Sequence, residues 1–146
     1  MGTGLVLLRE GFEASLVVCF TGVSRGSDTI IREQNAGLKQ SSEETINALH
    51  QLKADALAMK RTMLLGDMAS MAKILARSWV AKKRTAGSVT TALIDELYER
   101  AIASGALGGK VSGAGGGGFM MFMVPQEDRR QVILPLKAGG AMASPV

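Results

Sequence analysis

The sequence is poor in the side chains that disulfides and most metal sites require. Among its 146 residues it has one cysteine, Cys19, and one histidine, His50. A single cysteine excludes an internal disulfide framework, and one cysteine with one histidine excludes the common zinc patterns. His50 has no partner at ligand spacing, so we assign it no catalytic role. Cys19 lies in an apolar run, which predicts an inert, buried thiol.

Aromatic residues and long apolar runs are also scarce. Only 4% of the residues are aromatic, and the 17 Lys and Arg are interspersed with 13 Asp and Glu, for a formal charge of +4. Nucleic-acid surfaces usually combine clustered basic side chains with stacking aromatics, so we expect no nucleic-acid partner. The longest uncharged apolar stretch, residues 111–125, is too short and too rich in glycine to span a bilayer as a helix. We therefore expect a cytoplasmic protein without a secretory signal or membrane segment.

The composition is nevertheless that of a folded protein. Hydrophobic residues make up 47% of the chain and the mean hydropathy is +0.18. This is enough apolar material to offset the conformational entropy that folding removes. The length suits one domain, and no internal repeat or linker divides the chain. We expect residues 1–146 to form a single domain without a metal site.

Helical periodicity dominates the middle of the chain. The apolar spacing predicts a short helix whose pattern opens at residues 30–31, after a turn at residues 24–28, and fades near residue 37, and a long helix from Ser41 to Gly66. Ser41 and Glu44 would form its capping box. Asp67 would cap the next helix, antiparallel to the long one, and a third helix is predicted near residues 91–104.

Strands are predicted toward both ends of the chain. The uncharged, β-branched run at residues 14–21 is typical of a buried strand, and further strands are predicted at residues 5–8, 109–112, 119–124 and after Gly139. Residues 126–137 have a helical pattern that Pro135 should kink or end early. This order of elements predicts an α+β fold, in which helices pack on one face of a small, mostly antiparallel sheet.

The most informative segment is residues 110–119, KVSGAGGGGF, in which five glycines fall within six residues. Fixing each backbone costs about 1–2 kcal/mol, with glycine at the high end. An ordered glycine tract gains close access to anions, because successive N–H groups can surround phosphate oxygens. On composition alone, a wide hairpin loop or a flexible linker is an equal alternative. The spacing matches neither the Walker A pattern nor the dinucleotide fingerprint.

This segment resembles the third conserved motif of the GHMP kinases. The resemblance covers about residues 13–137 and is closest to the sugar-kinase branch that includes heptose 7-phosphate kinases. Besides the glycine tract it rests on three segments: Thr21-Gly22-Val23-Ser24-Arg25, Trp79 with Lys82-Lys83-Arg84, and residues 94–101.

The resemblance implies a ferredoxin-like C-terminal domain that packs, in the complete enzyme, against an N-terminal domain carrying most of the ATP site. Family members transfer the γ-phosphoryl group of Mg-ATP to a hydroxyl of a sugar or small alcohol. By position, backbone amides of the glycine tract would line the phosphate cleft. The residues concerned are Gly113, Ala114, Gly115, Gly116 and Gly117.

The family's N-terminal motifs do not occur in this sequence. Its first motif, its proline-led Gly-Ser-Ser phosphate loop and its catalytic Asp are all missing. We therefore expect the N-terminal ATP-binding domain to be absent and this chain to contain no catalytic residue. ATP and Mg²⁺ would belong to the complete enzyme, and the chain alone would neither bind them tightly nor phosphorylate a sugar.

Four further residues are candidates for binding the sugar or sugar phosphate. The guanidinium of Arg25 would offer a phosphate two parallel hydrogen bonds, although a plain surface arginine is the favoured alternative. Lys83 ends a helix, where a cation also complements the helix dipole without any ligand. Lys110 precedes the glycine tract and would face either the phosphates or solvent, and Ser112 lies beside it.

The alternative function is a stand-alone ferredoxin-like module that binds a ligand or self-associates. The tail at residues 140–146 stops where the family usually continues with a strand, so it would leave a sheet edge exposed. Such an edge would allow pairing with another copy and a homo-oligomer.

Overall fold

The computed structural model describes residues 9–146. None of the helices in this range combines the length and the apolar character needed to cross a membrane. The strand expected at residues 5–8 lies outside the described residues. After helical residues 9–14 the elements are β1 (Leu16–Phe20), α2 (Asp28–Lys39), α3 (Glu43–Leu65), α4 (Met68–Lys83), a 3-10 turn (Gly87–Val89), α5 (Ala92–Ala103), β2 (Gly108–Val111), β3 (Phe119–Met123), a second 3-10 turn (Gln126–Asp128), α6 (Arg129–Ala138) and β4 (Met142–Pro145).

The four strands form one antiparallel sheet in the order β2-β3-β1-β4. The central strand β1 pairs with β3 on one side, where Phe20 lies opposite Phe119, and with β4 on the other, where Phe20 lies opposite Met142. A helical crossover separates β1 from the β2–β3 hairpin, and α6 separates the hairpin from β4. This is the ferredoxin-like arrangement, and it confirms the predicted α+β fold.

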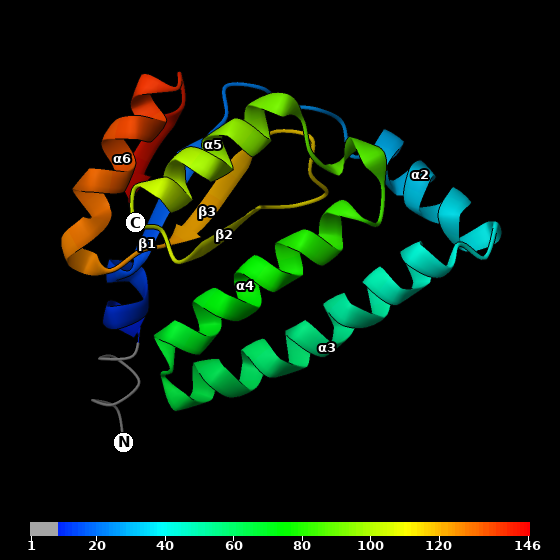
Figure 1. The fold of residues 1–146 in the computed structure, drawn as a ribbon, viewed down its shortest axis with the longest axis horizontal. Coiled ribbons are helices and arrows are strands. Elements are labelled where there is room, and N and C mark those ends of the chain that lie inside the picture. Colours follow the sequence, from blue (N-terminus) through cyan, green and yellow to red (C-terminus); the bar gives the residue numbers. More distant parts are fainter. Residues whose placement is uncertain (1–8) are drawn as a thin grey trace.

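One face of the sheet holds the main core. Successive side chains of a strand point to opposite faces, so Val17 and Cys19 of β1 share a face with Met120 and Phe122 of β3, and all four are fully buried. Helices α5 and α6 cover this face (Figure 1). Their buried side chains include Leu97 and Leu136, and α4 adds Trp79.

The opposite face, which we call the open face, is covered only in part. Leu16 and Met123 pack there against Met71 and Leu75 of α4. Helices α3 and α4 lie antiparallel beside the sheet, as predicted (Figure 1). The backbone of α4 reaches β2 directly, since a Cβ on Gly108 would stand 2.3 Å from the Ala72 carbonyl oxygen.

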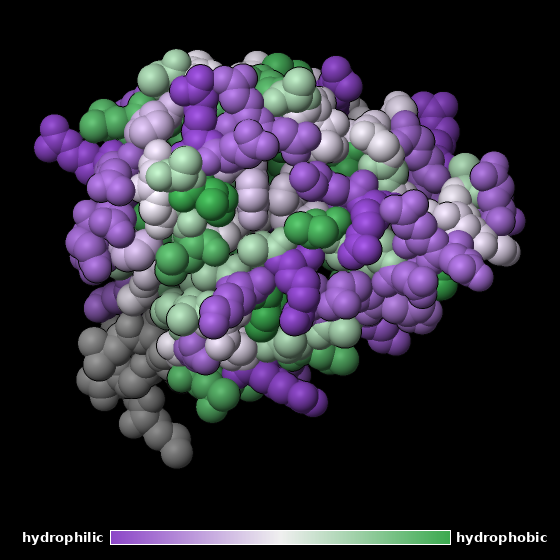
Figure 2. All heavy atoms as spheres, viewed as in Figure 1, coloured by the Kyte–Doolittle hydropathy of each residue, from purple (hydrophilic) through white to green (hydrophobic). Residues whose placement is uncertain are grey.

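Apolar surface is exposed where α3 turns into α4. Leu64 and Leu65 end α3 with side chains 73% and 80% exposed. Figure 2 shows hydrophobic side chains gathered at this turn, whereas hydrophilic ones cover most of α2 at the other end of the molecule. The turn between α3 and α4 and the helix α2 therefore differ in polarity.

The start of α3 corrects the sequence prediction by one residue. Ser42, not Ser41, is the N-cap, and its side chain accepts a hydrogen bond from the Thr45 amide. Ser41 instead takes a left-handed conformation with φ of 53°. The reason is the tight reversal after α2, in which the Ser42 amide donates to the Gly37 carbonyl. The predicted caps Gly66 and Asp67 are confirmed.

Pro135 does not end α6 early, which was one of the two effects expected of it. Helix α6 continues through Pro135 to Ala138. Proline removes one N–H donor, but the next turn is intact, because the Gly139 amide donates to the Pro135 carbonyl and the Ala141 amide to the Leu136 carbonyl. The fully buried side chains of Val132 and Leu136 anchor the helix on both sides of the proline.

The cap assignment predicts different outcomes for the two neighbouring serines. Ser42→Ala should lower the free energy of unfolding by about 1 kcal/mol, because the Thr45 amide loses its acceptor. Ser41→Gly should raise it by several tenths of a kcal/mol up to about 1, because glycine adopts a positive φ without strain. Urea unfolding measures both. A comparable loss of stability in the two variants would contradict the assignment.

Candidate functional site

The glycine tract forms the loop between β2 and β3. The Ser112 amide donates to the Phe119 carbonyl over 2.7 Å and closes the hairpin. Beyond Ser112 the backbone takes conformations that side chains disfavour. Five glycines of the loop have positive φ: Gly113, Gly115, Gly116, Gly117 and Gly118.

Two amides of this loop bind neighbouring segments of the protein. The Gly116 amide donates to the Val89 carbonyl over 2.7 Å, and the Gly118 amide donates to the Val23 carbonyl over 2.6 Å. The Gly118 carbonyl in turn accepts from the Thr21 amide over 3.0 Å. The loop is thus tied to the segment after β1 and to the segment before α5.

These contacts explain why glycine is required. A Cβ on Gly115 would lie 2.6 Å from the Val89 carbonyl oxygen, and one on Gly117 would lie 2.5 Å from the Val23 carbonyl oxygen. Both distances are too short for real atoms, so any side chain would push the loop away from its anchors. Residues 115–117 are buried. This packing argues against the flexible-linker alternative for the tract.

Other amides of the loop remain available to a ligand. Within the described part of the chain, no acceptor is seen for the amides of Gly113, Ala114, Gly115 and Gly117. Gly113 is exposed and Ala114 is half-buried. Five amides were expected to line a phosphate cleft. The Gly116 amide is hydrogen-bonded within the protein, and the other four remain available to a ligand.

The residue before Val89 is bound by a carboxylate. Glu33 of α2 accepts from the amide and the hydroxyl of Ser88, over 3.1 and 2.7 Å. The hydroxyl and then the amide of Ser88 lower the pKa of Glu33 below its ordinary value. Helix α2 thereby fixes the short turn that precedes α5 and that receives the loop.

Arg25 lies beside the loop, as its place in the sequence motif suggests. It lines a pocket of about 240 Å³ together with Gly116 and Gly117, and the first turn of α5 forms another wall. Thr91 begins α5 by accepting a hydrogen bond from the Ile94 amide over 3.2 Å. A helix N-terminus and an exposed guanidinium both favour a negatively charged ligand.

The two neighbouring lysines at the end of α4 have different contacts. Lys83 lies 3.3 Å from the Asp95 carboxylate and 5.9 Å from the centre of the Trp79 ring, so its charge is used within the protein. The ammonium of Lys82 donates instead to the Gly113 carbonyl of the glycine loop. Sequence reasoning singled out Lys83 and missed Lys82, because consecutive residues of a helix point in different directions.

Lys110 lies on the open face of the sheet. Its neighbour Val111 points into the main core, and Lys110 pairs across the sheet with Met121. Burial and, to a lesser degree, the nearby charge of Lys110 lower the pKa of Lys82 from 10.5 to about 8. Lys82 and Lys110 also line one pocket, so their charges interact. Ser112 is exposed at the start of the loop.

The remaining ionisable candidates lie away from the loop. Cys19 is buried in β1, and burial raises the pKa of its thiol to about 11, in line with an unreactive side chain. His50 is exposed on α3. Residues 9–146 contain no group of three or more His, Cys, Asp or Glu side chains that could hold a metal ion.

Comparison with known proteins accounts for these features. The family model described as "GHMP kinases C terminal" matches residues 56–141, more than half of the chain. The chain belongs to the GHMP kinase family. The family resemblance of the glycine tract is thereby confirmed.

This GHMP kinase chain is similar to proteins that are much longer than itself. It is 36% identical over 125 residues to a D-glycero-alpha-D-manno-heptose 7-phosphate kinase of Campylobacter jejuni, covering 86% of this chain and 36% of that protein. It is 26% identical over 113 residues to an L-fucokinase/L-fucose-1-P guanylyltransferase of Bacteroides fragilis, covering 77% and 12%. The chain thus spans about a third or less of the curated relatives that it matches.

Solved structures of the family have the same fold. A D-glycero-D-manno-heptose 1-phosphate kinase from Bacteroides thetaiotaomicron is 26% identical, with a TM-score of 0.63 over 96% of this chain and 34% of that one. A mevalonate kinase of L. major, solved with R-mevalonate, has a TM-score of 0.77 at 18% identity, covering 84% and 37%. The fold therefore persists where the sequences have diverged.

The close approach at Gly115 predicts a large loss of stability on substitution. Gly115→Ala should lower the free energy of unfolding by about 2–4 kcal/mol, because its Cβ meets the Val89 carbonyl. Gly113→Ala is the matched control: nothing lies within 4 Å of its Cβ, and only its φ of 75° is strained, which costs about 1–2 kcal/mol. Chemical denaturation distinguishes them, and equal losses would show that the anchor at Val89 contributes nothing.

The lowered pKa of Lys82 predicts a pH-dependent stability. Between pH 8 and 10.5 the folded chain holds fewer protons at Lys82 than the unfolded chain does, so this residue makes the free energy of unfolding rise with pH in that window. Lys82→Met should remove this rise, and Lys60→Met, on an exposed part of α3, should not. Urea unfolding at several pH values tests the difference between variant and wild type. Parallel curves for wild type and Lys82→Met would exclude the effect.

Proposed function

We propose that this chain is the C-terminal part of an ATP-dependent kinase that transfers a phosphoryl group to a hydroxyl of a sugar or sugar phosphate. Family membership and the names of the C. jejuni and B. fragilis relatives support this proposal. An N-terminal domain would carry most of the nucleotide site, and the chain alone would be inactive. In this proposal the enzyme works in the cytoplasm.

The geometry of the glycine loop is the observation that carries the proposal. Two of its amides hold it against Val89 and Val23, and its other amides are free of acceptors in the described part of the chain. Arg25 and Lys82 place positive charge on two sides of it. Phosphoryl transfer requires little more than positioning and stabilisation of negative charge, which preorganised amides and cations supply.

We further propose a heptose phosphate as the sugar substrate. Two of the similar proteins are named as kinases of heptose phosphates. A substrate that already carries a phosphate suits a site with more than one cation, and Arg25 is the residue that would hold it through paired hydrogen bonds. Lys110 would add a second positive charge near Gly113, and Ser112 a hydroxyl. Lys83 would not bind the substrate itself but would hold the carboxylate of Asp95 in place.

Mg²⁺ is expected in the complete enzyme as part of Mg-ATP. The residues described here do not fit a site for it, since they include no acidic cluster. We therefore assign no Mg²⁺ ligand in this chain and derive no step through the ion. Its ligands would come from the nucleotide phosphates and the N-terminal domain.

A row of apolar side chains on the open face favours self-association as a second candidate function. Phe119, Phe20 and Met142 lie side by side across three strands. The two phenylalanine rings are 5.0 Å apart, and Phe119 and Met142 are 54% and 67% exposed. In a kinase this surface would face the N-terminal domain, whereas in a stand-alone module it would contact a second copy.

Reconstitution tests the kinase proposal. A chimera should join this chain to the N-terminal part of the C. jejuni relative, in place of that protein's own C-terminal part. We expect ATP-dependent phosphorylation of heptose 7-phosphate by the chimera, because the nucleotide site and the glycine loop are then both present. Coupled release of ADP measures it.

The two halves expressed separately and left unmixed serve as controls and should give no turnover. A chimera that folds, as judged by circular dichroism, yet never phosphorylates a sugar phosphate would contradict the kinase proposal. Light scattering of the chain alone decides the second candidate, since a stable dimer together with an inactive chimera favours the module.

A further inference from the structure

A second pocket lies on the open face, between the sheet and the α3–α4 pair. Its volume is about 480 Å³, within the usual range of small-molecule sites. Most of its wall is apolar, and the few polar side chains that reach it come from Asp55, Ser78, Lys82 and Lys110. The apolar part includes Leu16, Met59, Met71, Leu75 and Met123.

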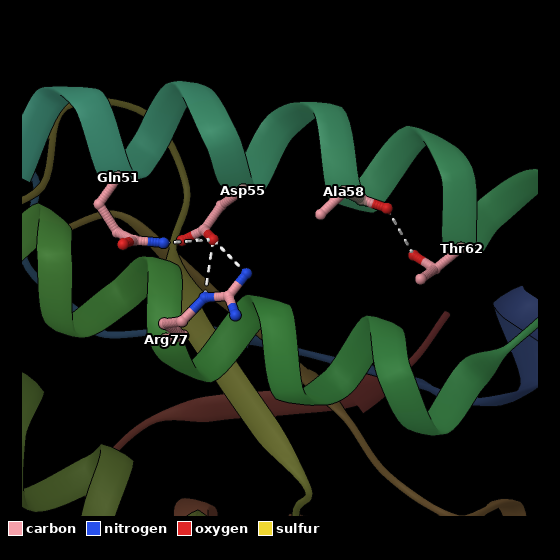
Figure 3. Close-up of polar contacts among 5 residues, drawn as sticks. All are labelled: Gln51, Asp55, Ala58, Thr62 and Arg77. Atoms are coloured by element: carbon pink, nitrogen blue, oxygen red, sulfur yellow. Dashed lines mark hydrogen bonds and ion pairs between the residues drawn. The ribbon is translucent and has the colours of Figure 1, made fainter.

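One polar group of this pocket is a buried carboxylate with an unused oxygen. Asp55 of α3 is only 2% exposed. Its Oδ1 accepts from Gln51 over 2.9 Å and from the Nε of Arg77 over 2.7 Å (Figure 3). Its Oδ2 is buried and has no hydrogen-bond partner among the described residues. Buried carboxylate oxygens normally accept hydrogen bonds, so Oδ2 is an unused acceptor, which a ligand donor reaches by displacing the side chains that now cover it.

The second polar group of the pocket is a pair of cations. Lys82 and Lys110 both line it. Within residues 9–146, neither forms an ion pair with a carboxylate. Two ammonium groups that approach one another repel, and an anion placed between them relieves that repulsion. This end of the pocket is therefore suited to a carboxylate or phosphate group.

The two polar ends are a short distance apart. Arg77, which binds Asp55, and Lys82 are separated by five positions on α4, or about 7.5 Å along a helix axis. The wall between them is formed by the apolar side chains of α3, α4 and the sheet. A ligand that contacts both ends thus needs an apolar body of several carbons, and eight-carbon acids are suitable probes.

We propose that this pocket binds a small apolar acid that carries a hydrogen-bond donor at its far end. The acid group would bind Lys82 and Lys110, the hydrocarbon would contact the methionines and leucines, and a hydroxyl would donate to Oδ2 of Asp55. The apolar wall does not suit a sugar phosphate, whose many hydroxyls would lie unsatisfied against it, so the pocket shares only its two lysines with the surroundings of the glycine loop. It does not depend on the chain being part of a kinase.

Binding in this pocket would affect the glycine loop. Lys82 donates to the Gly113 carbonyl and also lines the pocket, so a bound anion competes with the loop for the same ammonium group. The ligand would thereby weaken the contact between Lys82 and the loop without contacting the nucleotide.

Calorimetric titration of the 146-residue chain with three eight-carbon probes tests the proposal. Octanoate should bind about tenfold more tightly than 1-octanol, which has the same number of carbons and no charge. 8-Hydroxyoctanoate should bind at least as tightly as octanoate, although its tail is more polar, because Asp55 accepts its hydroxyl. No measurable binding of octanoate, or equal binding of octanoate and octanol, overturns the proposal, and a tenfold weaker hydroxy acid overturns the role of Asp55.

Charge variants identify the site. The double variant Lys82→Met with Lys110→Met should lose the tenfold preference for octanoate, and Lys60→Met, the matched change outside the pocket, should keep it. In the wild type, octanoate should also shift the backbone NMR signal of Gly113, which a site elsewhere would not do. A preference that survives in the double variant overturns the assignment.

Titration of the chimera shows whether the pocket is a ligand site or a surface that the N-terminal domain covers. Octanoate should bind the chimera as it binds the chain alone. Binding to the chain but not to the chimera would show that the N-terminal domain covers the pocket, and would overturn the proposal. Because these titrations need neither ATP nor sugar, their failure is independent of a failure to phosphorylate.

Discussion

The close approach of two backbone carbonyls to the glycine loop determines the geometry of the candidate site. The Val89 and Val23 carbonyls accept hydrogen bonds from the amides of Gly116 and Gly118, and a Cβ on the residue before each donor, Gly115 or Gly117, would collide with the same carbonyl. Arg25 follows Val23 by two residues, and Thr91, the cap of α5, follows Val89 by two. The same two anchors therefore bring a guanidinium and a helix N-terminus to the loop. Without glycine at this point, these groups would belong to separate parts of the surface.

The two faces of the sheet have different roles. One face is buried under α5 and α6 and provides the main core. The open face is covered in part by α4 and presents an apolar row, a pocket and two lysines. Contiguous exposed apolar surface is uncommon on a monomeric protein and typically marks a binding site. Its presence on one face is what a surface that contacts another domain or a ligand requires.

Local sequence patterns predicted most of the elements. Apolar periodicity located the long helices, and Gly66 and Asp67 marked the boundary between α3 and α4, because their preferences act within a few residues. Two local rules gave wrong results. The serine that caps α3 depends on the reversal that follows α2, and the tolerance of α6 for Pro135 depends on the burial of Val132 and Leu136. In both, packing outweighed the local preference.

The sequence by itself determined the fold class, the family and the identity of the loop, because periodicity and a run of glycines are visible in consecutive residues. Only the tertiary structure decided which groups meet at the loop. Lys82 and Lys83 are indistinguishable in the sequence, yet one binds the loop and the other binds Asp95. Asp55, with its orphaned oxygen, and Lys110 line the same pocket although they are far apart in the chain. Such pairings arise from the packing of distant segments, which no local pattern encodes.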